Sequence, residues 1–195
     1  MNPAAFPSAF PMALLGDPIV TAACSAAGAL VLLLSVAPKL RGFDRFHGAV
    51  DAYRLVPSAW SRAVALAFVA AEAGAALLLA LMPLHAASAL AAIAVAALAT
   101  GAVTVNLLRG RRDIRCGCGG ADDSMPLSGG LVGRNAALLA VLAVAAASAA
   151  VGSERRMAAL DFAAAGFCTL ALLLMWLGAT QLLVNAGRAR GPRRS

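Results

Sequence analysis

Five long apolar segments limit what this chain can fold into. Each contains about 20 mostly apolar residues, enough for an α-helix to cross the roughly 30 Å hydrocarbon core of a bilayer. The chain is 62% hydrophobic and 13% charged, whereas soluble domains carry about 25% charged residues. We therefore expect an all-α, polytopic transmembrane bundle that forms a single domain over residues 1–195. The expected spans are residues 19–37, 60–81, 86–108, 130–151 and 158–184.

The basic residues divide unevenly between the two sides of these spans. Of the sixteen Lys and Arg residues, fourteen fall on one side, and only Arg155 and Arg156 fall on the other. Because Lys and Arg in short loops mark the cytoplasmic side, this distribution predicts an inner-membrane protein with its N-terminus outside and its C-terminus inside. Residues 185–195 then form a basic cytoplasmic tail. The fourteen residues are Lys39, Arg41, Arg45, Arg54, Arg62, Arg109, Arg111, Arg112, Arg115, Arg134, Arg188, Arg190, Arg193 and Arg194.

This topology also accounts for the net charge of +7. Basic residues beside membrane spans contact the anionic lipids of the cytoplasmic leaflet. The lipid bilayer is therefore the partner that the charge predicts, and nucleic acid is not expected. The first span has no basic residue before it and is followed at once by Lys39 and Arg41, so we expect it to be retained and not cleaved as a signal peptide.

A short, arginine-flanked loop between the third and fourth spans contains Cys116 and Cys118. Two cysteines one residue apart close only a cramped disulfide ring, and strain makes a disulfide easier to reduce. Nearby arginines favour the nucleophilic thiolate, because positive charge lowers the pKa of a thiol. The motif predicts a redox pair for thiol–disulfide exchange. The alternative is that the arginines only set the topology and the cysteines have no chemical role.

Two further cysteines, Cys24 and Cys168, lie within the expected spans. Disulfide-bonded residues have Cα atoms within about 7 Å of each other. At a rise of about 1.5 Å per residue, both cysteines are too deep in the membrane to reach the pair in the loop. They could approach each other, but buried cysteine often serves as a small apolar side chain. We favour this second interpretation.

The cysteine loop fits a metal site less well than a redox site. Structural zinc sites use four ligands and a C-x2–4-C spacing, whereas this loop offers two sulfurs one residue apart. His47 is the nearest plausible third ligand, and Asp122 and Asp123 are better explained as residues that keep the loop hydrated. We expect no metal and no cofactor.

Glu72 is an ionisable residue near the middle of the second span. It lies ten residues after Arg62, which corresponds to about 15 Å of helix. Ionisable groups at this depth are costly and usually functional. Alanines and Gly74 surround it, so a neighbouring helix can come close and supply a partner. Glu72 is either a hydrogen-bonding residue that holds the bundle together or a proton relay that accompanies thiol oxidation.

The loop after the first span has a helical pattern of its own. Phe43, Phe46, Val50 and Tyr53 recur at helical spacing, with basic residues between them. This pattern predicts a short amphipathic helix in the membrane interface that ends before Pro57. The helix would lie on the same side of the membrane as the cysteine pair.

Together, these motifs resemble the methylamine utilisation protein MauE family, whose members are related to DoxX-like membrane proteins. The similarity rests on residues 39–43 (KLRGF) with 52–57 (AYRLVP), on 72–74 (EAG) and on 111–120 (RRDIRCGCGG). It covers the chain from the first span to at least the fourth. Gly119 stands where many members of the family have an aromatic residue. The resemblance implies a DoxX/MauE-like core of four helices plus one further helix.

The resemblance also implies a role in producing methylamine dehydrogenase. The small (β) subunit of that enzyme is exported and crosslinked by many disulfides, and MauE proteins act in its maturation or transport beside a thioredoxin-like protein, MauD. Carried onto this chain, Cys116 and Cys118 would be the exchanging pair. Tyr53, Arg54 and Glu72 match motif positions without an assigned role. We expect an accessory factor and not an enzyme that converts a metabolite.

Two questions stay open at this point. The charge distribution places the cysteine pair inside the cell, whereas the substrate implied by the resemblance matures outside. Either Cys24 and Cys168 pass reducing equivalents across the bilayer, or the orientation is reversed. The alternative function is a DoxX-like scaffold or respiratory-chain accessory that needs no cysteine chemistry. Small-molecule transport is less favoured, because only Glu72, Asn106 and Asp161 provide polar groups inside the spans.

Overall fold

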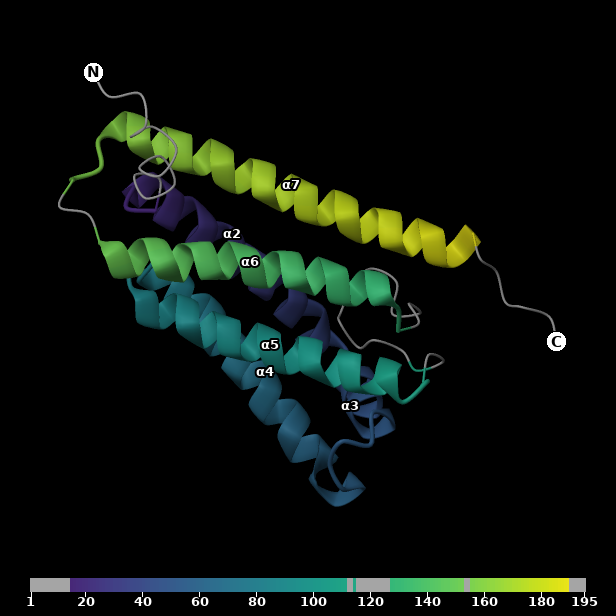
Figure 1. Ribbon diagram of the computed structural model, residues 1–195. Coiled ribbons are helices and arrows are strands. Elements are labelled where there is room, and N and C mark those ends of the chain that lie inside the picture. The colour runs from purple at the N-terminus through teal and green to yellow at the C-terminus, as the bar shows by residue number, and fades with distance from the viewer. Residues whose placement is uncertain (1–14, 112–113, 115–126, 153–154, 190–195) are drawn as a thin grey trace, which may run out of the picture.

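Six helices and no β-strand make up the described part of the chain. The computed structural model describes residues 15–111, 114, 127–152 and 155–189. Five of the helices are long and apolar enough to cross a membrane, which confirms the expected all-α, polytopic architecture. The helices are α2 (Pro18–Arg41), α3 (Phe43–Ala52), α4 (Ser58–Leu81), α5 (Ala86–Leu108), α6 (Gly129–Val151) and α7 (Ala159–Ala189) (Figure 1).

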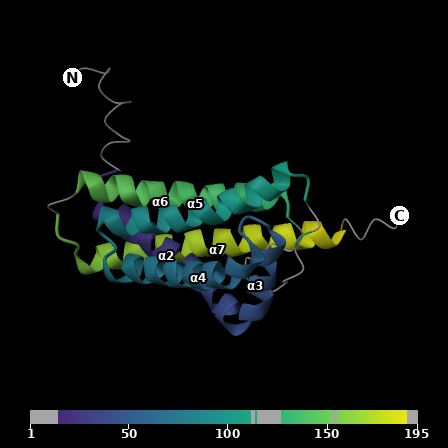
Figure 2. The same cartoon turned by 90° about the horizontal axis from the view of Figure 1, so that it is seen from below.

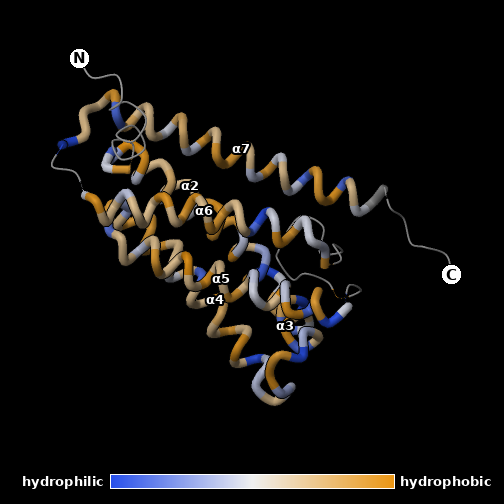
Figure 3. The backbone as a smooth tube through the Cα atoms, viewed as in Figure 1, coloured by the Kyte–Doolittle hydropathy of each residue, from blue (hydrophilic) through white to orange (hydrophobic). Residues whose placement is uncertain are grey.

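Helix α2 is the centre of the bundle. It packs against α4, α6 and α7, while α5 lies against both α4 and α6 (Figure 2). The short helix α3 lies at the end where α2 and α5 finish and α4 and α6 begin, which we call the α3 end. Helix α7 packs mainly on α2 and leaves most of its apolar surface uncovered. Figure 3 shows the long helices as largely hydrophobic, with hydrophilic residues near the ends of the bundle.

Small and apolar side chains form the interior of the bundle. Gly28 of α2 lies so close to α6 that a Cβ added there would be 2.6 Å from Cδ2 of Leu142. Leu142 and Leu79 are fully buried beside it. Small residues of this kind let helix backbones approach where lipid supplies no hydrophobic drive for association. Gly28 therefore allows α2 and α6 to pack closely.

Polar contacts tie the helices together at the end opposite α3. The hydroxyl oxygens of Thr21 on α2 and Ser148 on α6 are 2.6 Å apart and buried. Ser25 donates a hydrogen bond of 2.7 Å to the backbone carbonyl of Pro83, in the short connection between α4 and α5. This connection, residues 82–85, is too short for anything but a tight antiparallel hairpin of α4 and α5.

The predicted amphipathic helix is present as α3. Phe46 is buried on its inner face and Tyr53 is buried directly after its last residue, while Phe43 and Val50 pack against the bundle partly covered. His47 faces α4, and its Nε2 lies 2.9 Å from the hydroxyl of Ser61. The apolar face of α3 therefore closes one end of the bundle.

The first span extends beyond the boundary expected from the sequence. Helix α2 continues past Pro38 to Arg41, so Lys39 belongs to the helix and not to the loop to which the charge distribution assigned it. Its side chain is only 5% exposed. A prediction from hydropathy ends a span before its first charged residue, but here Glu72 of α4 neutralises the charge of Lys39. Lys39 therefore lies inside the bundle.

Candidate functional site at the α3 end

Glu72 of α4 has a partner of opposite charge on α2. The Lys39 ammonium lies 2.6 Å from Oε2 of Glu72, and both side chains are 5% exposed. The buried alanines that follow Glu72, Ala75 and Ala76, leave room for a neighbouring helix, as the sequence suggested. Charges removed from water need a close counter-charge and further hydrogen bonds to offset the lost hydration. The pair meets this requirement inside the bundle.

The Lys39 ammonium makes three further contacts besides its ion pair. Nζ also donates a hydrogen bond of 3.0 Å to the hydroxyl of Ser35, one turn earlier in α2. Two aromatic rings lie on either side, with Nζ 5.3 Å from the ring centroid of Phe46 and 5.0 Å from that of Phe68. Desolvated cation–π contacts of this kind contribute about 2 kcal/mol. Residues from three helices, α2, α3 and α4, thus hold one cation.

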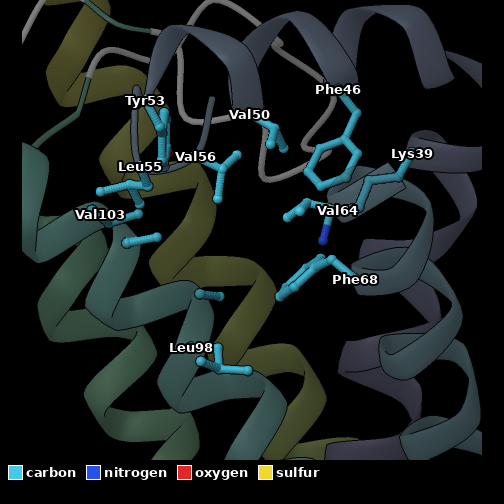
Figure 4. Close-up of a pocket in the computed structure, with 12 residues that line it drawn as sticks. Lys39, Phe46, Val50, Tyr53, Leu55, Val56, Val64, Phe68, Leu98 and Val103 are labelled. Carbon is cyan, nitrogen blue, oxygen red and sulfur yellow. The ribbon is translucent and has the colours of Figure 1, made fainter. Parts of the chain in front are cut away.

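A cavity of about 290 Å³ opens beside this pair (Figure 4). Its walls come from α3, α4, α5 and the chain after α3, and they are almost entirely apolar. The nitrogen of Lys39 points between Phe46 and Phe68 into this space. Leu98 at the rim is 67% exposed, so the cavity opens on the outer surface of the bundle. The site suits a small apolar group with one hydrogen-bond acceptor.

Tyr53 forms the opposite wall of the cavity. Burial raises the pKa of Tyr53 above its ordinary value, because the phenolate would lose hydration. Its hydroxyl therefore stays protonated throughout the physiological range. Tyr53 also packs against Val103 and Leu131, which links the cavity to the start of α6.

The two described ends of the cysteine loop meet beside Tyr53. The amide of Leu127 donates a hydrogen bond of 3.2 Å to the carbonyl of Ile114, and both side chains join the cluster around Tyr53. Arg111 donates one hydrogen bond of 3.2 Å to the carbonyl of Tyr53 and another of 3.4 Å to Oδ1 of Asn106. We call this arrangement of residues 111, 114 and 127 the loop neck. It fixes where the loop leaves and rejoins the bundle.

The structure brings together some of the predicted site residues. Cys116 and Cys118 lie outside the described residues. Cys24, half-buried, and Cys168, exposed, are both free thiols. They lie on facing stretches of α2 and α7, since Thr169 donates a hydrogen bond of 3.4 Å to the carbonyl of Ala23. Glu72, in the middle of α4, pairs with Lys39 from the last turns of α2.

Sequence reasoning missed Lys39 as the partner of Glu72. One signal was available: Lys39 directly follows Pro38 at the end of a long apolar run in which Ser35 is the only polar residue after Ser25, so it is a cation at the edge of the hydrocarbon core. His47, considered as a metal ligand, instead faces Ser61. Among the residues that the structure describes, no three His, Cys, Asp or Glu side chains gather as metal ligands.

Together the fold and the site define a polytopic α-helical membrane protein with a buried ion pair beside an interfacial helix. The family model described as methylamine utilisation protein MauE matches residues 17–148. The chain belongs to this MauE family.

Curated relatives agree with this assignment. The chain is 39% identical to methylamine utilization protein MauE of Paracoccus denitrificans over 60% of its own length and 63% of that protein. It is 38% identical to the Methylorubrum extorquens protein of the same name, over 65% of this chain and 68% of that one. With the Paracoccus versutus protein, identity is 34% over 86% of this chain and 89% of the relative. No solved structure matches the chain.

Proposed function

We propose that this chain acts in the maturation of the small (β) subunit of methylamine dehydrogenase, by thiol–disulfide exchange at Cys116 and Cys118. Membership of a family named for methylamine utilisation supports the pathway. The structural observation that supports this site is the loop neck, which holds the two described ends of the cysteine loop together beside Tyr53. The neck therefore fixes the two points of the bundle that flank the cysteine pair in the sequence.

The exchange has a simple electron balance. Before export, while the subunit is on the same side of the membrane as the loop, one of its thiolates attacks the Cys116–Cys118 disulfide, one sulfur leaves as a thiolate, and a mixed disulfide forms. A second thiol of the subunit resolves it. The subunit loses two electrons and two protons as its disulfide forms, and the cysteine pair gains them. A thioredoxin-like, MauD-type partner then reoxidises the pair with its own disulfide. The strain in a one-residue ring favours this direction.

We further propose that the α3 end faces the cytoplasm of a cell with this protein in its inner membrane. The fourteen basic residues assigned to this side support the orientation. Labelling of intact cells with a membrane-impermeant maleimide tests it, in a chain that carries Cys24→Ser and Cys168→Ser so that only the loop thiols remain. Labelling that requires permeabilisation is expected. Prompt labelling of intact cells would show that the orientation is the reverse of the proposed one.

The exchange itself is tested in a cell that depends on this chain for growth on methylamine. The double variant Cys116→Ser/Cys118→Ser should abolish accumulation of disulfide-bonded small subunit. The matched control, Cys24→Ser/Cys168→Ser, removes as many thiols and should leave accumulation unchanged. Full accumulation in the loop variant would contradict the proposal and favour a scaffold without cysteine chemistry. Membrane levels of each variant are compared by immunoblotting.

A further inference from the structure

Arg134, in the second turn of α6, is held between α6 and α7 by neutral groups. Its guanidinium carbon lies 4.6 Å from the ring centroid of Trp176. It donates a hydrogen bond of 3.1 Å to Oδ1 of Asn135 and a long one of 3.5 Å to the hydroxyl of Thr180. Its Nε is buried and has no hydrogen-bond partner among the described residues. These contacts fix the position of the side chain, but none of them neutralises its positive charge.

Four of the five described carboxylates are in ion pairs with other residues, and the fifth, Asp51, whose buried Oδ1 has no hydrogen-bond partner among the described residues, is not paired with Arg134 either. Glu72 is paired with Lys39, and Asp17 and Asp161 contact Arg155 at the opposite end of the bundle. None of the ion pairs found among the described residues includes Arg134. An arginine inside a membrane span is costly unless an anion accompanies it. Among the described residues, Arg134 is therefore a partly buried positive charge without a counter-anion, and it is available to an external anion.

An apolar groove leads away from Arg134 toward the middle of the bundle. It has a volume of about 200 Å³ and lies between α2, α6 and α7. Arg134, Leu138 and Val141 line it from one face of α6, since residues three to four apart share a helix face. Leu172 and Met175 line it from α7. Arg134 lies about 7.5 Å along α6 from Gly129, and Val141 about 10 Å further.

We propose that this groove binds an anionic phospholipid, with its phosphate on Arg134 and one acyl chain between α6 and α7. The planar guanidinium can donate two parallel hydrogen bonds to a phosphate, and Nε is one of the donors used for this geometry. Thr180 and Asn135 lie beside the same position. The apolar walls beyond Arg134 match a hydrocarbon chain, and the uncovered surface of α7 leaves the groove accessible from the bilayer.

Quenching of Trp176 by brominated lipid tests this site directly. The chain has two tryptophans, so Trp60→Phe leaves Trp176 as the single fluorophore. The full chain is reconstituted in phosphatidylcholine vesicles that contain increasing fractions of phosphatidylglycerol with brominated acyl chains. Brominated phosphatidylcholine serves as the comparison. We expect half-maximal quenching at a mole fraction of phosphatidylglycerol about fivefold lower, because one basic residue adds roughly 1 kcal/mol of attraction.

Variants separate the two parts of the site. Arg134→Gln should remove the preference for phosphatidylglycerol, whereas Arg155→Gln, at the opposite end, should keep it. Val141→Phe should raise the mole fraction needed for quenching by filling the groove while it keeps the charge. Equal quenching by the two lipids, or an undiminished preference in Arg134→Gln, would overturn the proposal. Unchanged quenching in Val141→Phe would overturn the placement of the acyl chain. Helical content by circular dichroism verifies that each variant is folded.

Discussion

The ammonium of Lys39 and the carboxylate of Glu72 lie 2.6 Å apart, although 33 residues separate them in the chain. One comes from the last turns of α2 and the other from the middle of α4. Both are almost fully buried. Because α3 packs Phe46 onto the same ammonium, the pair connects the interior of the bundle to the helix that closes its end.

Removing one member of this pair should destabilise the bundle strongly. Lys39→Met leaves Glu72 buried without its counter-charge, which costs about 3–5 kcal/mol. The double variant Lys39→Met/Glu72→Leu should lose much less, because it replaces the pair with apolar groups. Thermal unfolding in detergent measures both effects. Additive losses in the double variant would show that the two charges are not coupled.

The exposed pair between Arg62 and Asp44 provides the matched control. Their nitrogen and oxygen atoms are 3.8 Å apart, and the side chains are 66% and 88% exposed. Arg62→Gln should change the free energy of unfolding by no more than about 1 kcal/mol, since exposed ion pairs contribute little. The contrast with Lys39→Met tests whether burial decides the effect.

A side chain at Gly28 should loosen the contact between α2 and α6. Gly28→Val places carbon atoms against Leu142, which is fully buried and has little room to move. Overpacking of this kind costs about 1–3 kcal/mol. Gly101→Val is the control, because a Cβ at Gly101 meets nothing within 4 Å. Unfolding in detergent should separate the two variants; equal losses would mean that helix propensity alone explains the effect.

The hydroxyl contact between Thr21 and Ser148 should stabilise the end opposite α3. Thr21→Val keeps the shape of the side chain and removes the 2.6 Å contact. Hydrogen bonds between transmembrane helices contribute about 0.6 kcal/mol on average and up to about 1.7 kcal/mol. A double-mutant cycle with Ser148→Ala measures the coupling energy. Thr104→Val is the control, because Thr104 donates within its own helix to the carbonyl of Thr100; a coupling near zero for Thr21 would contradict the assignment.

Shortening Leu127 should open the loop neck. Leu127 is 2% exposed and packs with Tyr53 and Leu131. Leu127→Ala removes about 2 kcal/mol or more of packing energy. The fraction of molecules in which the loop neck is open should therefore rise more than tenfold. Limited proteolysis between residues 109 and 128 should accelerate accordingly. Leu108→Ala, at a side chain that is 83% exposed, should leave the cleavage rate unchanged; equal rates in both variants would show that Leu127 does not hold the neck.

Local sequence patterns are enough to predict the spans, the tight hairpin between α4 and α5, and the amphipathic helix α3. These features follow from local patterns: a run of apolar residues long enough to cross a membrane, a connection too short for anything but a hairpin, and aromatic residues at helical spacing. The sequence also singles out Glu72, because a carboxylate among alanines inside a span stands out against its surroundings.

Which residues meet across the helices depends on how the whole bundle packs. The pairing of Glu72 with Lys39 depends on the rotation and crossing of two helices, and the end of α2 moves past Pro38 because a carboxylate from α4 compensates the charge. Likewise, the sequence shows Arg134 only as one of the basic residues that predict the orientation in the membrane. In the structure it packs against Trp176 beside an apolar groove. Hydropathy is a property of neighbouring residues, but partners across helices are set by the packing of the whole bundle.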